Sequence, residues 1–348
     1  MTRTATVRRL ATATAYGGGS VALGGAAVVA LLREEARQAR RVIEARTSRG
    51  DPPSGNGVYG QPSRKGRGKP LVFAVLGDSS AVGLGVQRAT QTPGVLVAAA
   101  LTELAERPVR LVRLAVSGAR SADLDAQVDK ALAEHPDVAL IMIGANDVTS
   151  RIRPAVSVRY LADAVRRLTA AGCEVVVGTC PDLGTIRPIA QPLRIFARRW
   201  SRQMAAAQTV AVVEAGGRTV SLGSVLGPAF ASDRGLFSVD QFHPSAHGYA
   251  QAAAVLLPSV AEAIGVWPAS ADRGRRPIRR GTVRPIAQAA ARAASRTGTE
   301  VQPTRVAGAE AGRRGPWVLL RRRKPTDLLS PEQMEETAEA TPSAEAVG

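Results

Sequence analysis

The sequence predicts an α/β protein with a parallel sheet that is covered by helices on both faces. Between residues 70 and 268, short apolar runs alternate with longer helical stretches, which is the pattern of repeated strand–helix units. The runs are apolar at nearly every position, as expected for strands buried on both faces. This region holds about 200 residues, enough for one domain around one core.

The first expected strand is the run LVFAVL, which ends in Gly-Asp. All five expected strands are short, and they lie at residues 71–76, 109–116, 137–143, 174–180 and 219–222. Five helices alternate with them, at residues 92–106, 122–134, 154–171, 193–215 and 245–264. Local signals mark several helix ends: Pro108 follows the first helix, Gly172 closes the third, and Ser245 caps the last.

Residues 10–32 form an uncharged run that is long enough to span a bilayer as a helix. Three arginines precede it, as in a signal sequence, but no small-residue cleavage site stands before Arg33, so an uncleaved membrane anchor is the favoured interpretation. A twin-arginine export signal and a soluble Ala/Gly-rich helix are the alternatives. Arginines lie on both sides of the run, so the side of the membrane stays open.

Four regions are therefore expected. Residues 1–49 hold the anchor-like segment and a basic helix, residues 50–69 a Gly/Pro/Ser linker, residues 70–268 the folded domain, and residues 269–348 a disordered tail that is first basic and then acidic. The net charge of +17 lies almost wholly in the ends, since residues 70–268 carry only +2. A nucleic-acid partner for the folded domain is therefore not indicated.

Composition excludes other classes of protein. Two cysteines cannot build a disulfide scaffold or a cysteine-based zinc site, and three histidines leave little for a metal centre, so neither metal nor cofactor is expected. Cys173 and Cys180 flank the fourth expected strand. They would lie about 23 Å apart, too far for a disulfide, and are interpreted as buried, inert thiols.

Polar residues follow the expected strands, and parallel sheets bind ligands at this carboxyl edge. Gly77-Asp78-Ser79-Ser80 follows the first strand, Ser117-Gly118-Ala119 the second and Gly144-Ala145-Asn146-Asp147 the third. Asp240 and His243 stand just before the last helix. One edge thus collects the groups that nucleophilic catalysis needs.

Each of these residue types has a chemical reason. The Ser79 hydroxyl needs an adjacent base, which His243 supplies, and Asp240 fixes the tautomer of the imidazole. The backbone N–H groups of Ser79 and Gly118 and the side-chain amide of Asn146 are the candidate oxyanion donors. Asp78 and Asp147 are supporting residues, Asp147 by bracing its loop, and Gly83 and Gly85 are interpreted as loop flexibility near the nucleophile.

The four blocks resemble those of the SGNH, or GDSL-type, serine hydrolases over roughly residues 70–268: GDSS at 77–80, Gly118, GAND at 144–147 and DQFH at 240–243. The resemblance implies a flavodoxin-like three-layer α/β/α sandwich with a parallel five-stranded sheet, and ester hydrolysis through an acyl-enzyme. It implies Ser79 as the nucleophile, Gly118 and Asn146 as oxyanion donors, and Asp240 and His243 as the rest of the triad. Ser80 stands where the motif that names the family has leucine, a position without a chemical role.

The leading hypothesis is a serine esterase that acts on a small acyl ester or a lysolipid. The first alternative is an envelope glycan deacetylase or acyltransferase with the same triad, and the second is a membrane-tethered protein whose basic ends bind anionic ligands. Residues 183–199 are the expected pocket wall, and Asp182 is either a substrate-side residue or a turn residue. The protein is expected at a membrane through its N-terminal segment.

Overall fold

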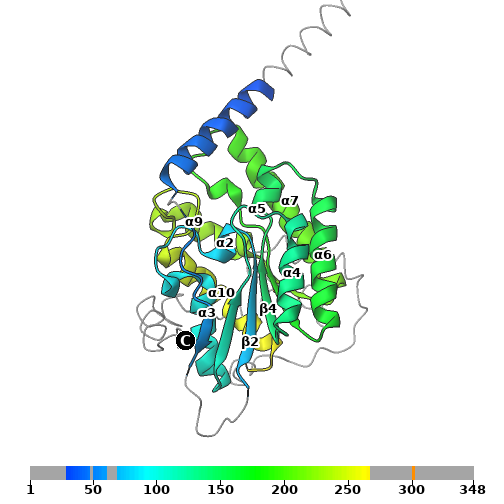
Figure 1. The fold of residues 1–348 in the computed structure, drawn as a ribbon. Coiled ribbons are helices and arrows are strands. Elements are labelled where there is room, and N and C mark those ends of the chain that lie inside the picture. Colours follow the sequence, from blue (N-terminus) through cyan, green and yellow to red (C-terminus); the bar gives the residue numbers. More distant parts are fainter. Residues whose placement is uncertain (1–28, 48–49, 61–68, 267–299, 302–348) are drawn as a thin grey trace, which may run out of the picture.

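The structure is a computed structural model that describes residues 29–47, 50–60, 69–266 and 300–301 (Figure 1). A seven-stranded sheet forms its centre, in the order β1-β3-β2-β4-β5-β6-β7. The strands are β1 (Gly57–Tyr59), β2 (Leu71–Gly77), β3 (Val109–Arg113), β4 (Val138–Met142), β5 (Glu174–Gly178), β6 (Arg218–Val220) and β7 (Glu300–Val301).

The five central strands, β2 to β6, are parallel, and their order along the sheet is that of the flavodoxin-like folds. The predicted fold class is confirmed, and the five predicted strands are parallel. The sheet is larger than predicted, because β1 and β7 add an antiparallel strand at each edge. β3 is shorter than predicted and ends at Arg113. Beyond this residue the N–H groups of Leu114 and Ala115 both donate to the Val75 carbonyl, which breaks the regular ladder.

Helices cover both faces of the sheet, as Figure 1 shows. One face carries α3 (Pro93–Ala105) and α10 (Ala246–Ala263); the other carries α4 (Leu124–Ala133) and α6 (Pro154–Ala170), with α7 (Leu193–Glu214) beside α6. These bounds agree with the five predicted helices to within two residues at each end. Four short helices at the sheet edge were not predicted: α2 (Ser79–Val82), α5 (Ala145–Thr149), α8 (Leu222–Val225) and α9 (Gly227–Ser232).

Alternation along β2 explains why its sequence is apolar throughout. Phe73 and Val75 join the hydrophobic cluster under α3 and α10, while Ala74 and Leu76 join the cluster under α4 and α6. Successive side chains of a strand point to opposite faces, so a strand between two helical layers needs apolar residues at every position. Because β2 is held on both faces, the residues that follow it have a fixed position at the carboxyl edge of the sheet.

The N-terminal part of the chain also packs on this domain. Residues 29–46 form a helix, called here the N-terminal helix, whose Ala39 belongs to a third hydrophobic cluster with residues of α7. β1 lies inside the expected linker 50–69 and pairs antiparallel with β3, burying Tyr59. The linker therefore contributes an edge strand, while the division of the chain into four regions stays a prediction.

Two expectations fall largely on residues that the structure does not describe. Most of the apolar run 10–32 and, apart from β7, the expected tail 269–348 lie outside the described residues. In the part of the chain that is described, no helix is both long enough and apolar enough to cross a bilayer.

Candidate active site

Ser79 begins helix α2 directly after the carboxyl end of β2. Asp78 caps this helix: its carboxylate accepts hydrogen bonds from the Ser80 N–H at 2.9 Å and from the Ser80 hydroxyl at 2.7 Å. Asp78 is buried, and its burial raises the pKa of the carboxyl. The tight strand-to-helix turn thus holds Ser79 at the sheet edge.

The structure brings the three residues predicted as a triad into one hydrogen-bonded chain. His243 Nε2 lies 3.0 Å from Ser79 Oγ, and His243 Nδ1 lies 2.7 Å from Asp240 Oδ2. The His243 side chain is mostly buried, and its ring stands edge to face on Phe242. These distances suit the removal of a proton from Ser79 by an imidazole whose other nitrogen is held by a carboxylate.

Asp240 is held by donors that lie close to it in the sequence. Its Oδ1 accepts bonds from the Ser238 hydroxyl at 2.7 Å and from the N–H groups of Phe242 and His243, both at 2.9 Å. Burial raises the pKa of this carboxyl, but hydrogen bonds from His243, Ser238 and Phe242 outweigh that effect, and the pKa lies below its usual range. Asp240 is therefore an anion in the resting protein.

Gly85, interpreted from the sequence as a point of loop flexibility, is instead tightly packed against His243. Its φ is +110°, and a Cβ there would lie 3.0 Å from His243 Cβ and 2.6 Å from the Pro244 carbonyl oxygen. The absence of a side chain lets the loop after α2 close over His243. The spacing of the glycines in the sequence does not predict this contact between Gly85 and His243.

The candidate oxyanion donors lie on two loops that a hydrogen bond connects. Gly118 has a φ of +83°, and a Cβ added to it would have no atom within 4 Å. Asn146 Nδ2 donates at 2.9 Å to the carbonyl of Ala119, the residue that follows Gly118. An amide nitrogen has two hydrogens, so the second one of Asn146 is available to a substrate oxygen. The Ser79 N–H lies in the first turn of α2, where a helix offers no acceptor.

Asp147 makes structural contacts behind this site. Its buried carboxylate accepts bonds from the Ser121 N–H at 3.0 Å and from the Ser157 hydroxyl at 2.7 Å. These bonds connect the loop after β4 with the start of α6 and with the segment after Gly118. The contacts agree with the role of a loop brace.

Two buried glutamines that the sequence analysis missed hold the ends of the strands. Gln127 makes two bonds with the backbone of Gly77, at 2.7 and 3.0 Å, and Gln208 accepts from the Cys180 N–H at 2.7 Å and donates to the Ile143 carbonyl at 2.9 Å. A signal for Gln127 does exist in the sequence. It shares the apolar face of its helix with Leu124 and Val128, where an uncharged amide needs a buried partner.

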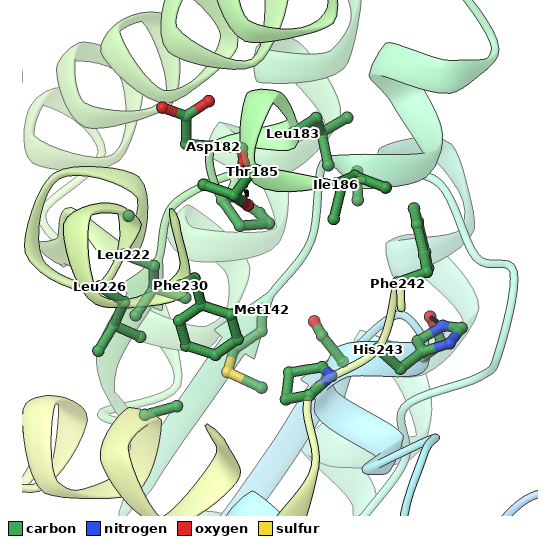
Figure 2. Close-up of a pocket in the computed structure, with 18 of the residues that line it drawn as sticks. Met142, Asp182, Leu183, Thr185, Ile186, Leu222, Leu226, Phe230, Phe242 and His243 are labelled. Atoms are coloured by element: carbon green, nitrogen blue, oxygen red, sulfur yellow. Dashed lines mark hydrogen bonds between the residues drawn. The ribbon is translucent and has the colours of Figure 1, made fainter. Parts of the chain in front are cut away.

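An apolar pocket opens beside Ser79 and His243 (Figure 2). It encloses about 870 Å³ including its opening to solvent, within the range of small-molecule sites. Its apolar walls come from β4, the turn after β5, the segment around α8 and α9, and the loop before His243. They include Met142, Leu183, Ile186, Leu222, Leu226, Phe230, Phe237 and Phe242.

The expected wall at residues 183–199 contributes only its first part. Leu183, Thr185 and Ile186 line the pocket, whereas none of the pocket-lining residues comes from α7. Asp182 also borders the pocket, but its carboxylate accepts from the Gly184 N–H at 2.8 Å and pairs with Arg202 at 3.1 Å. Its contacts are those of a turn residue.

Neither a metal site nor a disulfide is found in the described part of the chain. No group of three or more potential metal ligands occurs among these residues. Cys173 and Cys180 are both free and buried, and burial raises the pKa of Cys173 to about 12. The prediction that the two cysteines do not pair is confirmed.

A serine, a histidine and an aspartate in one hydrogen-bonded chain, at the carboxyl edge of a flavodoxin-like sheet, define the class of serine hydrolases with an α/β fold. Residues 75–251 match the GDSL-like Lipase/Acylhydrolase family, and the chain belongs to this family. It is an esterase that acts on ester bonds.

The chain is similar to the GDSL-like esterase Rv1075c of Mycobacterium tuberculosis, with 43% identity over 243 residues that cover 67% of this chain and 77% of the relative. Among solved structures, TesA matches with 22% identity and a TM-score of 0.45, covering 57% of this chain and 100% of TesA. A catalytic mutant of Axe2, an acetylxylan esterase from Geobacillus stearothermophilus, matches with 20% identity and a TM-score of 0.42, covering 57% of this chain and 95% of that one.

Proposed function

We propose that this esterase hydrolyses esters through a triad of Ser79, His243 and Asp240, and that its substrate is a small acyl ester or a lysolipid. The observation that carries the proposal is the hydrogen-bonded chain from Asp240 through His243 to Ser79, which ends beside an apolar pocket. The base lies within hydrogen-bond distance of both the nucleophile and the orienting carboxylate, as acyl transfer requires.

The reaction follows from these contacts. Ser79 Oγ attacks the ester carbonyl while His243 Nε2 takes its proton, and Asp240 stabilises the imidazolium that forms. The oxyanion accepts hydrogen bonds from the N–H groups of Ser79 and Gly118 and from Asn146 Nδ2. His243 then returns the proton to the leaving alkoxide, which leaves an acyl group on Ser79.

Water completes the cycle. His243 takes a proton from the water that attacks the acyl-enzyme, and a second tetrahedral species forms with its oxyanion on the same donors. When this species collapses, Ser79 recovers its proton from His243 and the carboxylic acid leaves. An alcohol that replaced the water would give acyl transfer with the same groups.

The pocket supports an acyl chain as the group bound beside Ser79. Its lining is mostly apolar, and both of its carboxylates have partners: Asp78 accepts hydrogen bonds from Ser80, and Asp182 accepts from a backbone N–H and pairs with arginines. An acyl chain placed there gains about 0.8 kcal/mol for each buried CH₂ group. The polar head of a lysolipid would remain at the opening of the pocket.

Replacement of Ser79 tests the proposal. Ser79→Ala in the full chain is expected to lower kcat on a short-chain chromogenic ester by at least about 10³-fold, because the nucleophile is gone while the fold is kept. Ser80→Ala is the matched control, since the Ser80 hydroxyl bonds to Asp78 and not to His243. Equal turnover by Ser79→Ala and the wild type would show that Ser79 is not the nucleophile. Acetate release from acetylated glycans, with no activity on acyl esters, would favour the glycan deacetylase instead.

We also propose that the protein associates with membranes through its N-terminal segment. The uncharged run 10–32 supports this, as do the exposed arginines of the N-terminal helix, which begins at residue 29 within this run. Large apolar side chains are exposed next to that helix, on its first turn and at the start of α7: Val29, Leu31, Ile195, Phe196 and Trp200. Exposed apolar and basic side chains on the N-terminal helix suit the interface of an anionic bilayer.

Sedimentation with lipid vesicles tests this second proposal. The full chain is expected to sediment with anionic phospholipid vesicles and to stay bound in 1 M salt. At about this concentration the Debye length is 3 Å, so electrostatic attraction is screened while apolar insertion is not. A chain that begins at residue 33 is expected to be released by salt. If the full chain stays in the supernatant at low salt, membrane association through this segment is excluded.

A further inference from the structure

Thr47, the residue that follows the N-terminal helix, contacts the triad. Its Oγ1 lies 3.0 Å from Asp240 Oδ2, although 193 positions separate the two residues. Asp240 Oδ2 is the same oxygen that holds His243 Nδ1 at 2.7 Å. A residue from outside the segment that matches the family thus reaches the carboxylate that orients the catalytic base.

The N-terminal helix is docked on the domain at other points as well. Ala39 is only 4% exposed and shares a hydrophobic cluster with Ile186 and Ile189, next to the substrate pocket, and Ile43 packs against this cluster. Glu35 Oε2 accepts a hydrogen bond of 3.0 Å from the N–H of Leu193, the first residue of α7. This N–H has no acceptor within its own helix, so the Glu35 carboxylate caps α7.

The single hydroxyl hydrogen of Thr47 has two acceptors within reach. The Ile43 carbonyl lies at 2.8 Å, but it already accepts the Thr47 N–H at 2.9 Å. Asp240 is the better acceptor because hydrogen bonds to a carboxylate anion are roughly twice as strong as those to a neutral carbonyl. The hydroxyl therefore donates to Asp240.

We propose that Thr47 is a positioning residue for the catalytic triad, and that the docked N-terminal helix is accordingly a part of the active site. The inference rests on the proposed function of Asp240 and His243. Oδ1 of Asp240 is fixed by three donors from residues 238–243, whereas Oδ2 is shared by His243 and Thr47. Thr47 thus holds the oxygen that directs the imidazole toward Ser79.

The position of Thr47 separates its effect on turnover from an effect on substrate binding. Thr47 is absent from the residues that line the pocket. Loss of its hydroxyl should weaken the alignment of His243 in the transition state and leave the contacts of the bound substrate unchanged. The inference therefore requires a fall in kcat with an unaltered KM.

The test uses the full chain with Thr47→Val, which keeps the shape of the side chain and removes the hydroxyl, and with Thr47→Ser, which keeps the hydroxyl. We expect Thr47→Val to lower kcat on a short-chain ester by about tenfold, the effect of one hydrogen bond to a charged group, with KM within about twofold. Thr47→Ser should restore most of kcat. Thr169→Val, which removes a hydroxyl that bonds only to backbone carbonyls in α6, is the matched control and should leave kcat unchanged.

A second variant tests the part played by the helix. Ala39→Asp places a charge in the buried contact of the N-terminal helix and should undock it, so kcat should fall at least as far as in Thr47→Val. In the double variant kcat should be no lower than in Ala39→Asp alone, because undocking the helix already removes the hydrogen bond from Thr47 to Asp240. Wild-type kcat in Thr47→Val, or additive losses in the double variant, would overturn the inference. If Ser79→Ala also remained active, the proposed function itself would be the part that failed.

Discussion

At the scale of single residues, Asp240 shows how the chain places a buried charge. Three of its hydrogen bonds come from Ser238, Phe242 and His243, so a short turn supplies nearly all the partners that an isolated carboxylate needs. This part of the site could be predicted from the block DQFH because its contacts are local. The bond from Thr47 could not, since no periodicity relates residues so far apart in the sequence.

The lowered pKa of Asp240 predicts a pH-dependent contribution to stability. A carboxyl whose pKa is lower in the folded than in the unfolded chain binds fewer protons when folded, so it stabilises the fold above its unfolded pKa of about 3.9. This stabilisation is lost as the pH falls toward the folded pKa. The wild type should therefore exceed Asp240→Asn in free energy of unfolding at pH 7, and the difference should shrink below about pH 4.

Urea unfolding at pH 7, 5 and 3 measures this difference. Asp163→Asn is the control for the loss of one carboxylate, because Asp163 is exposed on α6 and pairs with the exposed Arg166. A difference between the wild type and Asp240→Asn that stayed constant over the whole range would contradict the prediction. Activity should be low in Asp240→Asn at every pH, by about 10³- to 10⁴-fold, because the imidazole loses its orienting partner.

At the scale of elements, the regular helices and strands were predictable and the short ones were not. The predicted helices agree with the observed ones because each has an apolar face and recognisable ends, such as the Ser245 cap of α10. α8 and α9 are too short to show a period, yet they form the wall of the pocket opposite His243. The residues that form the hydrogen-bonded chain from Asp240 to Ser79 could thus be predicted from the sequence, while the shape of the pocket beside them could not.

This wall should set the length of the acyl chain that the enzyme accepts. Figure 2 shows Leu222, Leu226 and Phe230 at the end of the pocket remote from His243. Leu226→Trp should fill that end and lower kcat/KM for octanoyl and longer esters by about tenfold or more, while acetyl esters change by less than about threefold. Rates on a series of nitrophenyl esters from acetyl to dodecanoyl measure the effect.

The control for the added bulk is Ile195→Trp, at an exposed position of α7 outside the pocket lining. It should leave the chain-length profile unchanged. A parallel fall for all chain lengths in Leu226→Trp would mean that the acyl chain does not reach this wall, and that another part of the site limits the substrate.

At the scale of the whole molecule, the folded unit extends further toward the N-terminus than the strand–helix pattern predicts. β1 adds to the edge of the sheet beside β3, and the N-terminal helix covers apolar residues of α7 and the pocket wall. Neither segment continues the alternation of strands and helices, so the pattern places the start of the domain near residue 70. The charge distribution also does not show that the N-terminal segments belong to the folded unit. The basic excess that gives +17 lies mainly in the two ends of the chain, whereas the residues of the proposed triad lie in the nearly neutral centre.

The N-terminal segments should therefore contribute to stability. A chain of residues 70–268 lacks β1, loses the burial of Tyr59 and exposes β3 as an apolar edge strand, which favours association between molecules. Compared with a chain of residues 29–268, it should lose about 2–3 kcal/mol of stability. In a domain of this size each kcal/mol shifts the unfolding midpoint by about 2–4 °C, so the midpoint should be about 5–10 °C lower.

Calorimetry at several protein concentrations measures both the shift of the midpoint and the association. A chain of residues 50–268, which keeps β1 without the helix, separates the two contributions: equal midpoints for all three chains would show that neither segment stabilises the domain.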